Sequence, residues 1–172
     1  NLYDDNNDKL KAMEFYKKAA DNDDNESLLE LVQMIIDNDE KIEISNQEET
    51  KYFKKAADLG DYEAMYHYAD ALYYGKGVEI DKKKAIAFYK TAADHGSSNS
   101  MNKYANILYN GIGISANKVE AVKYYKKAIE QNNTDSMNNY GKILLKANQK
   151  VAAAALFKRA ADLNHIESMN LY

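Results

Sequence analysis

The stretch "FYKTAADHG", residues 88–96, recurs in closely similar form along the 172-residue chain and determines how the rest is interpreted. Its relatives are "FYKKAADND" from Phe15, "YFKKAADLG" from Tyr52, "YYKKAIEQN" from Tyr124 and "LFKRAADLN" from Leu156. Successive copies therefore start 37, 36, 36 and 32 residues apart. A fixed period of this length indicates a repeat array, in which each unit buries its apolar face against its neighbours.

A second segment keeps the same period and alternates with the first. It reads "EAMYHYADALYYGKG" from Glu63, "NSMNKYANILYNGIG" from Asn99 and "DSMNNYGKILLKANQ" from Asp135, with "ESLLELVQMIID" from Glu26 as a weaker relative. In both segments the apolar residues recur every three to four positions, which is the spacing of one helix face. We call the second segment helix A and the first helix B. No strand pattern is present and proline is absent, so the sequence predicts an all-α protein.

Residues that tolerate a left-handed backbone stand where the predicted helices end. Helix A is expected to end at the Gly75 and Gly111 turns, each of which reads Gly-x-Gly. The ends of helix B are expected at Asp23, Gly60, Gly96, Asn132 and Asn164. A Gly-x-Gly pair also occurs in phosphate-binding loops, but here no strand precedes it and no Lys-Ser/Thr follows. We interpret the glycines as helix caps.

Small residues at repeated positions are expected to let the helices approach closely. On helix A these are Ala64, Ser100, Ser136 and Ser168, followed about one turn later by Ala69, Ala105 and Gly141. On helix B they are Ala92, Ala93, Ala128, Ala160 and Ala161. The aromatic pair of helix B then fills the space between helix pairs.

Composition excludes several classes of function. The formal net charge is −4 and the isoelectric point is near 5.4, so the chain has no excess of positive charge to neutralise nucleic acid. No apolar run approaches the roughly 20 residues that span a bilayer, so we expect no direct membrane insertion. Cysteine is absent, which removes disulfides, thiolate zinc sites and cysteine nucleophiles.

No catalytic or cofactor-binding pattern is found. The three histidines, His67, His95 and His165, stand at non-equivalent places and none has a second ligand at metal-binding spacing. The serines stand mostly where helix A starts, as capping or close packing requires, and no Ser-His-Asp set can be singled out. We therefore predict a protein that is not an enzyme and has no cofactor or metal.

The unit "AMYHYADALYYGKGVEIDKKKAIAFYKTAADHG" from Ala64 resembles the Sel-one-like repeat family, which is related to the tetratricopeptide repeats. The resemblance rests on Ala64, Ala69, Leu72, Gly75, Gly77, Val78, Asp81, Lys84, Ala85, Phe88, Tyr89, Ala92, Ala93 and Gly96. It continues in the next unit through Gly111, Gly113, Ile114, Asn117, Ala121, Tyr124, Tyr125 and Asn132, and more loosely over nearly the whole chain. It implies antiparallel helix pairs stacked into a right-handed α/α superhelix, or solenoid, that binds proteins.

On this basis the chain is expected to be one array of about four repeats with partial repeats at both ends. The expected boundaries are 1–24 (partial), 25–61, 62–97, 98–133, 134–165 (shortened) and 166–172 (start of a further repeat). The stretch 1–5 resembles the tail of a helix A, so we expect further repeats or a neighbouring domain beside this segment. The missing cysteines exclude the family's disulfide-bonded branch, and the missing proline disfavours a tetratricopeptide assignment.

Two repeats depart from the pattern. The unit 25–61 lacks the glycines, which predicts a longer and more mobile loop after Asp37, and it carries Glu49 where helix B elsewhere has alanine. The unit 134–165 loses the Gly-x-Gly turn, so its connection is shorter by four residues.

The resemblance places the helix A residues that do not pack between units on an inner, concave wall. In the unit 25–61 the helical count gives Glu26, Leu29, Gln33 and Ile36. The candidate partner-binding residues in the next three units are Glu63, Tyr66, Asp70, Tyr73, Tyr74, Asn99, Asn102, Asn106, Tyr109, Asn110, Asp135, Asn138 and Lys142. Asparagine amides can pair with the backbone of an extended segment, and tyrosine adds apolar area with a polar tip.

We therefore expect a scaffold or adaptor that holds a peptide or a partner helix within a larger complex. The same asparagines could instead reflect the asparagine-rich composition of the chain. A structural subunit bound through helix B and the ends of the array is the alternative, and a hydrolase is a third and weaker one.

Overall fold

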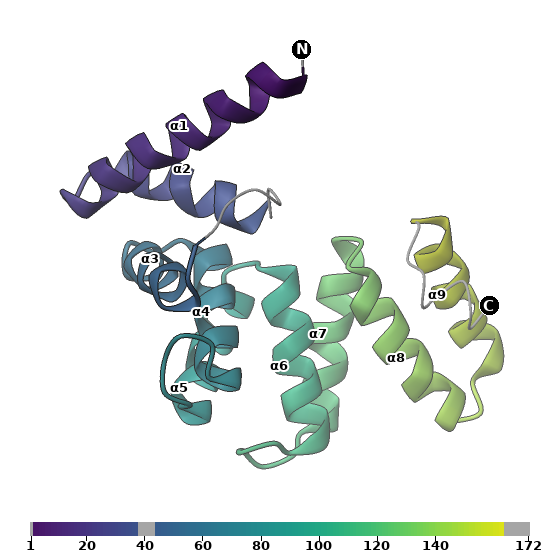
Figure 1. Cartoon of the computed structure of the whole chain (residues 1–172). Coiled ribbons are helices and arrows are strands. Elements are labelled where there is room, and N and C mark those ends of the chain that lie inside the picture. The colour runs from purple at the N-terminus through teal and green to yellow at the C-terminus, as the bar shows by residue number, and fades with distance from the viewer. Residues whose placement is uncertain (1, 38–43, 164–172) are drawn as a thin grey trace. The chain divides into compact units, whose positions relative to one another are not determined.

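The computed structural model describes residues 2–37 and 44–163, with side chains described from residue 9 onward. Over these residues all regular secondary structure is helical, as the sequence predicted (Figure 1). The helices are α1 (Leu2–Asp21), α2 (Asn25–Ile36), α3 (Asn46–Asp58), α4 (Tyr62–Tyr74), α5 (Lys82–Asp94), α6 (Ser98–Asn110), α7 (Lys118–Glu130), α8 (Thr134–Lys146) and α9 (Lys150–Asp162). Helix A corresponds to α2, α4, α6 and α8, and helix B to the odd-numbered helices.

The chain forms two compact units, Asn1–Ala85 and Ile86–Tyr172. In the first unit each helix from α1 to α4 packs on the next one along the chain. The first turn of α5 also belongs to this unit and contacts α4. Lys82 Nζ lies 5.3 Å from the ring centroid of Tyr73, and Lys84 Nζ lies 5.7 Å from that of Tyr68. These contacts hold the start of helix B against the preceding helix A.

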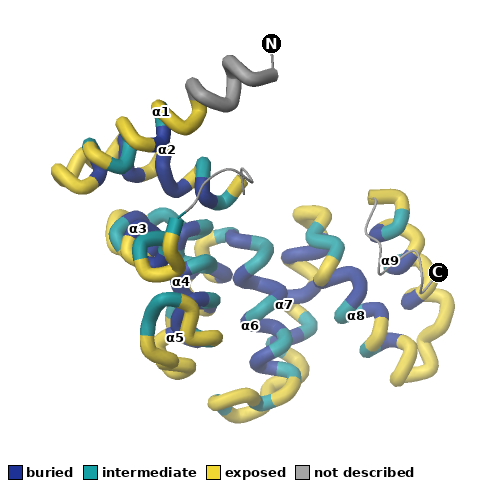
Figure 2. The backbone as a smooth tube through the Cα atoms, viewed as in Figure 1, coloured by how far each residue is buried: buried dark blue, intermediate teal, exposed yellow. Residues whose placement is uncertain are grey.

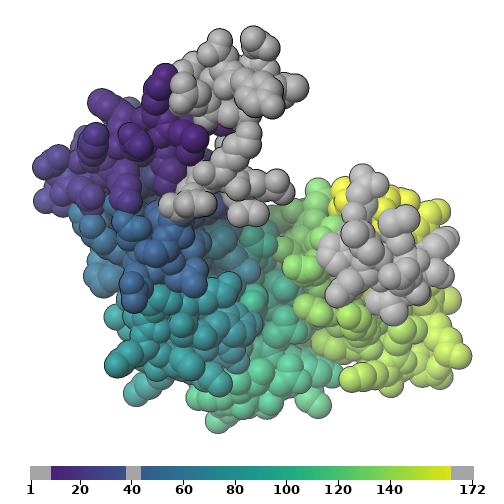
Figure 3. All heavy atoms as spheres, in the orientation of Figure 1, coloured from purple at the N-terminus to yellow at the C-terminus, as the bar shows by residue number. Residues whose placement is uncertain are grey.

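In the second unit α7 packs against both α6 and α8, α8 packs against α9, and α6 also touches α8. Buried residues lie where these helices face one another and exposed residues lie on the turns (Figure 2). The aromatic pair of helix B supplies much of the packing, since Tyr104 and Tyr124 meet edge to face at 5.1 Å and the Phe157 ring is almost fully buried. Within the second unit, the side chains of neighbouring helices fill space between their backbones on the visible face (Figure 3).

The helix ends follow the predicted residues. Gly75 and Gly111 cap α4 and α6 in the left-handed conformation, with φ of 76° and 67°. Asp23, Gly60, Gly96 and Asn132 also have positive φ, which confirms the predicted ends of helix B over the described residues. Asn164 lies outside them. In the shortened connection between α8 and α9, Asn148 has φ of 60° and takes the role of the missing glycine, which we did not predict.

Close packing at the small residues is also confirmed. Ala64, Ala69, Ser100, Ala105 and Ser136 are fully buried. Ser168 lies outside the described residues, so the expectation for that repeat is not addressed.

One expectation about the first residues was wrong. Residues 2–5 do not form the tail of a separate helix, because α1 runs without a break from Leu2 to Asp21. Neither glycine nor proline occurs in this range, so nothing in the sequence forces the helix to stop there. The expected mobile loop after Asp37, His165 and the further repeat at 166–172 fall on residues outside the described ranges, and the repeat boundaries stay a prediction.

Candidate protein-binding surface

Helix α4 presents a row of tyrosines on the face that the helical count predicted. Tyr66 and Tyr73 are half-buried and Tyr74 is 53% exposed. Their rings meet neighbours edge to face: Tyr73 and Tyr74 at 4.9 Å, and Tyr66 and His67 at 5.0 Å. Glu63 and Asp70 lie on the same face and are half-buried. This combination of aromatic area and carboxylates lies entirely on one helix.

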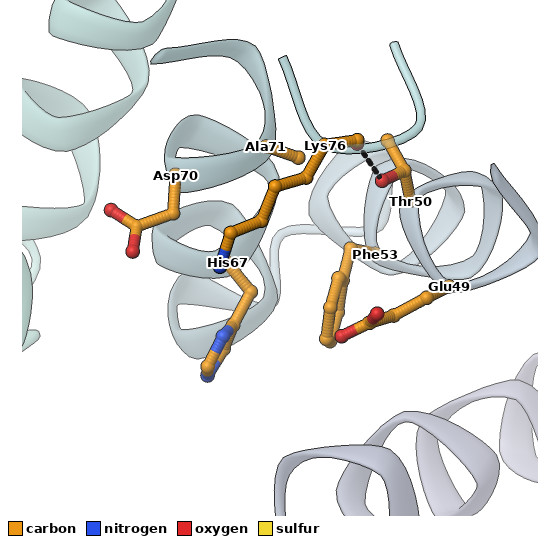
Figure 4. A pocket seen from close by; sticks show the side chains of 7 residues that line it. All are labelled: Glu49, Thr50, Phe53, His67, Asp70, Ala71 and Lys76. Atoms are coloured by element: carbon orange, nitrogen blue, oxygen red, sulfur yellow. Dashed lines mark hydrogen bonds between the residues drawn. The ribbon is translucent and has the colours of Figure 1, made fainter. Parts of the chain in front are cut away.

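A small open pocket lies beside this face, between α3, α4 and the turn after α4. Figure 4 shows its lining: the Phe53 and His67 rings lie side by side, and the Lys76 side chain reaches from the turn toward His67. The two rings are stacked, with centroids 4.8 Å apart and planes 16° from parallel. The remaining lining residues are Glu49, Thr50, Asp70 and Ala71.

The turn that forms one wall of the pocket is fixed to the start of α3. Thr50 Oγ1 donates a hydrogen bond of 2.7 Å to the carbonyl oxygen of Lys76. At Gly77 a Cβ atom would lie 2.1 Å from the carbonyl oxygen of Asn46, so only glycine permits this approach. This wall of the pocket is therefore held in place by the rest of the unit. Gly77 is needed both for the turn and for the close approach of its backbone to Asn46.

Burial lowers the pKa of His67 below its ordinary value of 6.5. The carboxylates of Glu63, Asp70 and Asp61 raise the pKa in part, and the ammonium of Lys76 lowers it further. The imidazole is therefore neutral at pH 7. The stacking of His67 on Phe53 could not be predicted from a lone histidine in the sequence.

In the second unit two predicted surface residues are buried instead. Asn102 is 6% exposed and Asn138 is 1% exposed, so the expectation that they line an open wall was wrong. Asn139 donates to Asn102 Oδ1 at 3.0 Å and so joins α8 to α6. Because α6 and α8 touch, the positions between them become part of the interface.

Asn106 is also engaged within the protein. Its Nδ2 donates to the carbonyl oxygen of Asn102 at 3.0 Å, and its Oδ1 accepts from the Tyr125 hydroxyl at 2.7 Å. Burial raises the pKa of Tyr125, which keeps this hydroxyl a donor. The asparagines therefore form an internal network across α6, α7 and α8, and no feature of the sequence distinguished this from a surface ladder.

The remaining predicted residues of the second unit keep accessible surface. Asn110, Asp135 and Lys142 are exposed, and Asn99 and Tyr109 are half-buried. Asn99 Oδ1 accepts from Asn133 at 3.1 Å, and the Lys118 ammonium lies 5.3 Å from the Tyr109 ring centroid. This surface is narrower than we expected, and its role in binding stays a prediction.

Among the side chains that the structure describes, no three His, Cys, Asp or Glu residues are grouped closely enough to hold a metal ion. His95 is exposed, with Nδ1 2.9 Å from the carbonyl oxygen of Thr91. In the described part of the chain, no helix combines the length and apolar character needed to span a bilayer.

Solved structures with the same fold include several Sel1 repeat proteins. A Sel1 repeat protein from Oxalobacter formigenes is 26% identical with a TM-score of 0.74, over 92% of this chain and 66% of that one. The protective antigen c5321 of uropathogenic Escherichia coli, which displays an SLR fold, is 23% identical with a TM-score of 0.76, over 91% of this chain and 34% of that one. Cysteine-rich protein B of Helicobacter pylori is 26% identical with a TM-score of 0.56, over 75% of this chain and 92% of that one.

A search of curated proteins found no significant match. The Sel1 repeat family model, in contrast, matches residues 6–24, 50–61, 63–97, 98–133 and 135–165, which together make up most of the chain. The chain therefore belongs to the Sel1 repeat family, whose members are all-α repeat solenoids and generally serve as protein–protein interaction modules.

Proposed function

We propose that this chain is a non-catalytic adaptor that binds an extended or helical segment of another protein on the helix A face of its repeats, within a larger assembly. The row of tyrosines on α4 carries the proposal. Tyrosine offers a large apolar face and a polar tip at low entropic cost, and it is enriched where proteins meet. Tyr74 is the most accessible of the three and would contribute most of the newly buried area.

The charges on the helix A residues of each unit favour a neutral or mildly basic segment. Glu63 and Asp70 lie among the tyrosines of α4, and Asp135 is exposed on α8. Carboxylates at the border of an aromatic surface steer cationic partners and disfavour acidic ones. The exposed amide of Asn110 and the ammonium of Lys142 add hydrogen-bond donors in the second unit.

The surface of α7 gives little support to the alternative, a structural subunit bound through helix B. A permanent interface would require a contiguous apolar patch. On α7 the exposed Val119 is followed along the same helix face by Lys123 and Lys126, both exposed. A single valine among lysines resembles an ordinary solvated surface.

The test is a comparison of bound proteins with a matched pair of variants. The full chain, its Tyr66→Ala/Tyr74→Ala variant and its Val119→Ala/Lys123→Ala variant are each used to capture proteins from an extract of the source cells, and the captured proteins are quantified by mass spectrometry. We expect the tyrosine variant to lose its specific partners by at least tenfold and the α7 variant to keep them. Circular dichroism melting curves establish that both variants are folded.

The opposite pattern would refute the proposal. If partners persist with the tyrosine variant and are lost with the α7 variant, binding occurs on helix B. Asn102 is unsuitable for such a test, because it is buried and hydrogen-bonded, so its replacement would weaken the fold itself.

A further inference from the structure

The pocket beside α4 contains a carboxylate at a position that other repeats give to a buried alanine. Glu49 is equivalent to Ala85, Ala121 and Ala153, which are all fully buried. Glu49 is only half-buried and lines the pocket together with Phe53 and His67. A glutamate in the first turn of a helix also interacts favourably with the helix dipole. That interaction is equally available at an exposed position and does not explain why a glutamate lines a pocket that also contains two aromatic rings.

The aromatic wall of the pocket is specific to this repeat. Phe53 is the second residue of the helix B aromatic pair, and its ring stacks on His67 of α4. The positions equivalent to His67 in the second unit are Lys103 and Asn139, so no such stacked pair can form there. Tyr66 meets the His67 ring edge to face but does not itself line the pocket.

Negative charge predominates around these rings. The carboxylates of Asp61, Glu63 and Asp70 all act on His67, and Lys76 supplies the opposing positive charge. Glu49 adds a further carboxylate at the pocket wall. Since His67 itself is neutral, the surroundings of the pocket favour a cation.

We propose that this pocket receives the guanidinium group of an arginine from the partner segment that binds along α4. The inference rests on the proposed function and names one anchor residue of that partner. A planar guanidinium can pack on the accessible part of the His67 ring, which itself stacks on the buried Phe53 ring, and donate paired hydrogen bonds to the Glu49 carboxylate. The exposed Lys76 side chain is long and flexible, and its ammonium must move aside when the arginine enters.

The proposal is tested with a single-residue probe, so that it does not depend on finding the partner. N-acetyl-arginine N-methylamide is titrated into the isotope-labelled full chain, and amide shifts are followed by NMR, with the citrulline analogue as a neutral probe of the same shape. We expect saturable shifts centred on Thr50, Phe53, His67 and Lys76, and binding of the citrulline analogue at least tenfold weaker.

Two variants must change the affinity in opposite directions. Glu49→Gln should weaken binding of the arginine probe about tenfold, which is equivalent to about 1.4 kcal/mol. Lys76→Met should strengthen it severalfold, because a competing cation is removed. Glu30→Gln changes the charge by the same amount at an exposed position of α2 outside the pocket and should leave the affinity unchanged.

Equal shifts from the two probes, unchanged binding to the Glu49→Gln variant, or weaker binding to the Lys76→Met variant would each overturn the proposal. The two proposals fail separately. The proposed function alone would be refuted if the arginine probe and the variants give the expected affinities while the captured partners are unaffected by the Tyr66 and Tyr74 substitutions.

Discussion

Replacing Gly141 by alanine should destabilise the second unit, although alanine is the better helix former. Gly141 lies inside α8, and a Cβ atom there would be 2.5 Å from Cε1 and 2.8 Å from Cζ of Phe157. Those distances are too short for non-bonded carbon atoms, so the ring or the helix would have to move. Phe157 is 1% exposed and packs with Leu144 and Ala153, so its ring has little room.

The magnitude follows from two opposing effects. Forcing an extra methyl group into a packed core costs about 1–3 kcal/mol, and the gain in helix propensity from glycine to alanine is about 1 kcal/mol. Because the contact falls on a rigid and buried ring, the upper part of the first range applies. We expect the free energy of unfolding to fall by about 1–2 kcal/mol in urea titrations followed by circular dichroism.

A double-mutant cycle tests the reasoning more strictly than the single variant. Phe157→Leu removes the ring atoms that the new methyl group would strike. In that background Gly141→Ala should raise the free energy of unfolding by up to about 1 kcal/mol, so the sign of its effect reverses. If Gly141→Ala is neutral in the original protein, or costs the same with and without the ring, the contact does not explain the glycine.

Three further predictions concern the network, the pocket histidine and the pocket wall. Asn102→Ala should cost about 1–3 kcal/mol in urea unfolding because Asn139 loses its buried acceptor, whereas the exposed Asn110→Ala should cost little; equal losses would contradict the network. Because the pKa of His67 is lowered in the folded state, the neutral imidazole contributes fully to the free energy of unfolding above about pH 6.5. This contribution is lost as the pH falls below that value and the histidine becomes protonated. Replacing His67 by glutamine should therefore remove part of the loss of stability below pH 6.5, and an unchanged pH profile would refute the assignment. Gly77→Ala should destabilise the protein more than Gly60→Ala, since both have positive φ but only Gly77 faces a backbone within 4 Å, and thermal melting of the two variants checks the order.

The sequence was sufficient for the fold because the relevant signals are local and recur with the repeat. Apolar spacing, small residues at contact positions such as Ala64, and glycine at the end of α4 each act within one or two helices. The predicted helix ends differed from the structure where no helix-ending residue was present, or where a residue other than glycine formed the turn. The continuous α1 helix lacks a breaking residue, and the short turn before α9 uses Asn148 where other repeats use glycine.

The candidate surface was harder to predict because it depends on which helices become neighbours. A helical count places Asn102 and Asn110 on one face and does not say that α8 covers part of it. The pocket was missed for a similar reason, since Glu49 and His67 come from different helices and meet only in the folded unit. Glu49 was nevertheless visible as a departure from the alanine pattern, and such departures are useful places to search for sites in repeat proteins.

The hydrogen bond between Tyr125 and Asn106 has a consequence for how the repeats find their order during folding. Repeats of nearly the same sequence can dock on the wrong neighbour or exchange between chains, which is a common route to misfolding in such proteins. If α9 took the place of α7, Phe157 would stand where Tyr125 belongs, and Asn106 would lose its hydroxyl donor. A net hydrogen bond contributes about 0.5–1.5 kcal/mol, so the pair between Tyr125 and the half-buried Asn106 penalises an incorrect pairing that apolar contacts alone would accept.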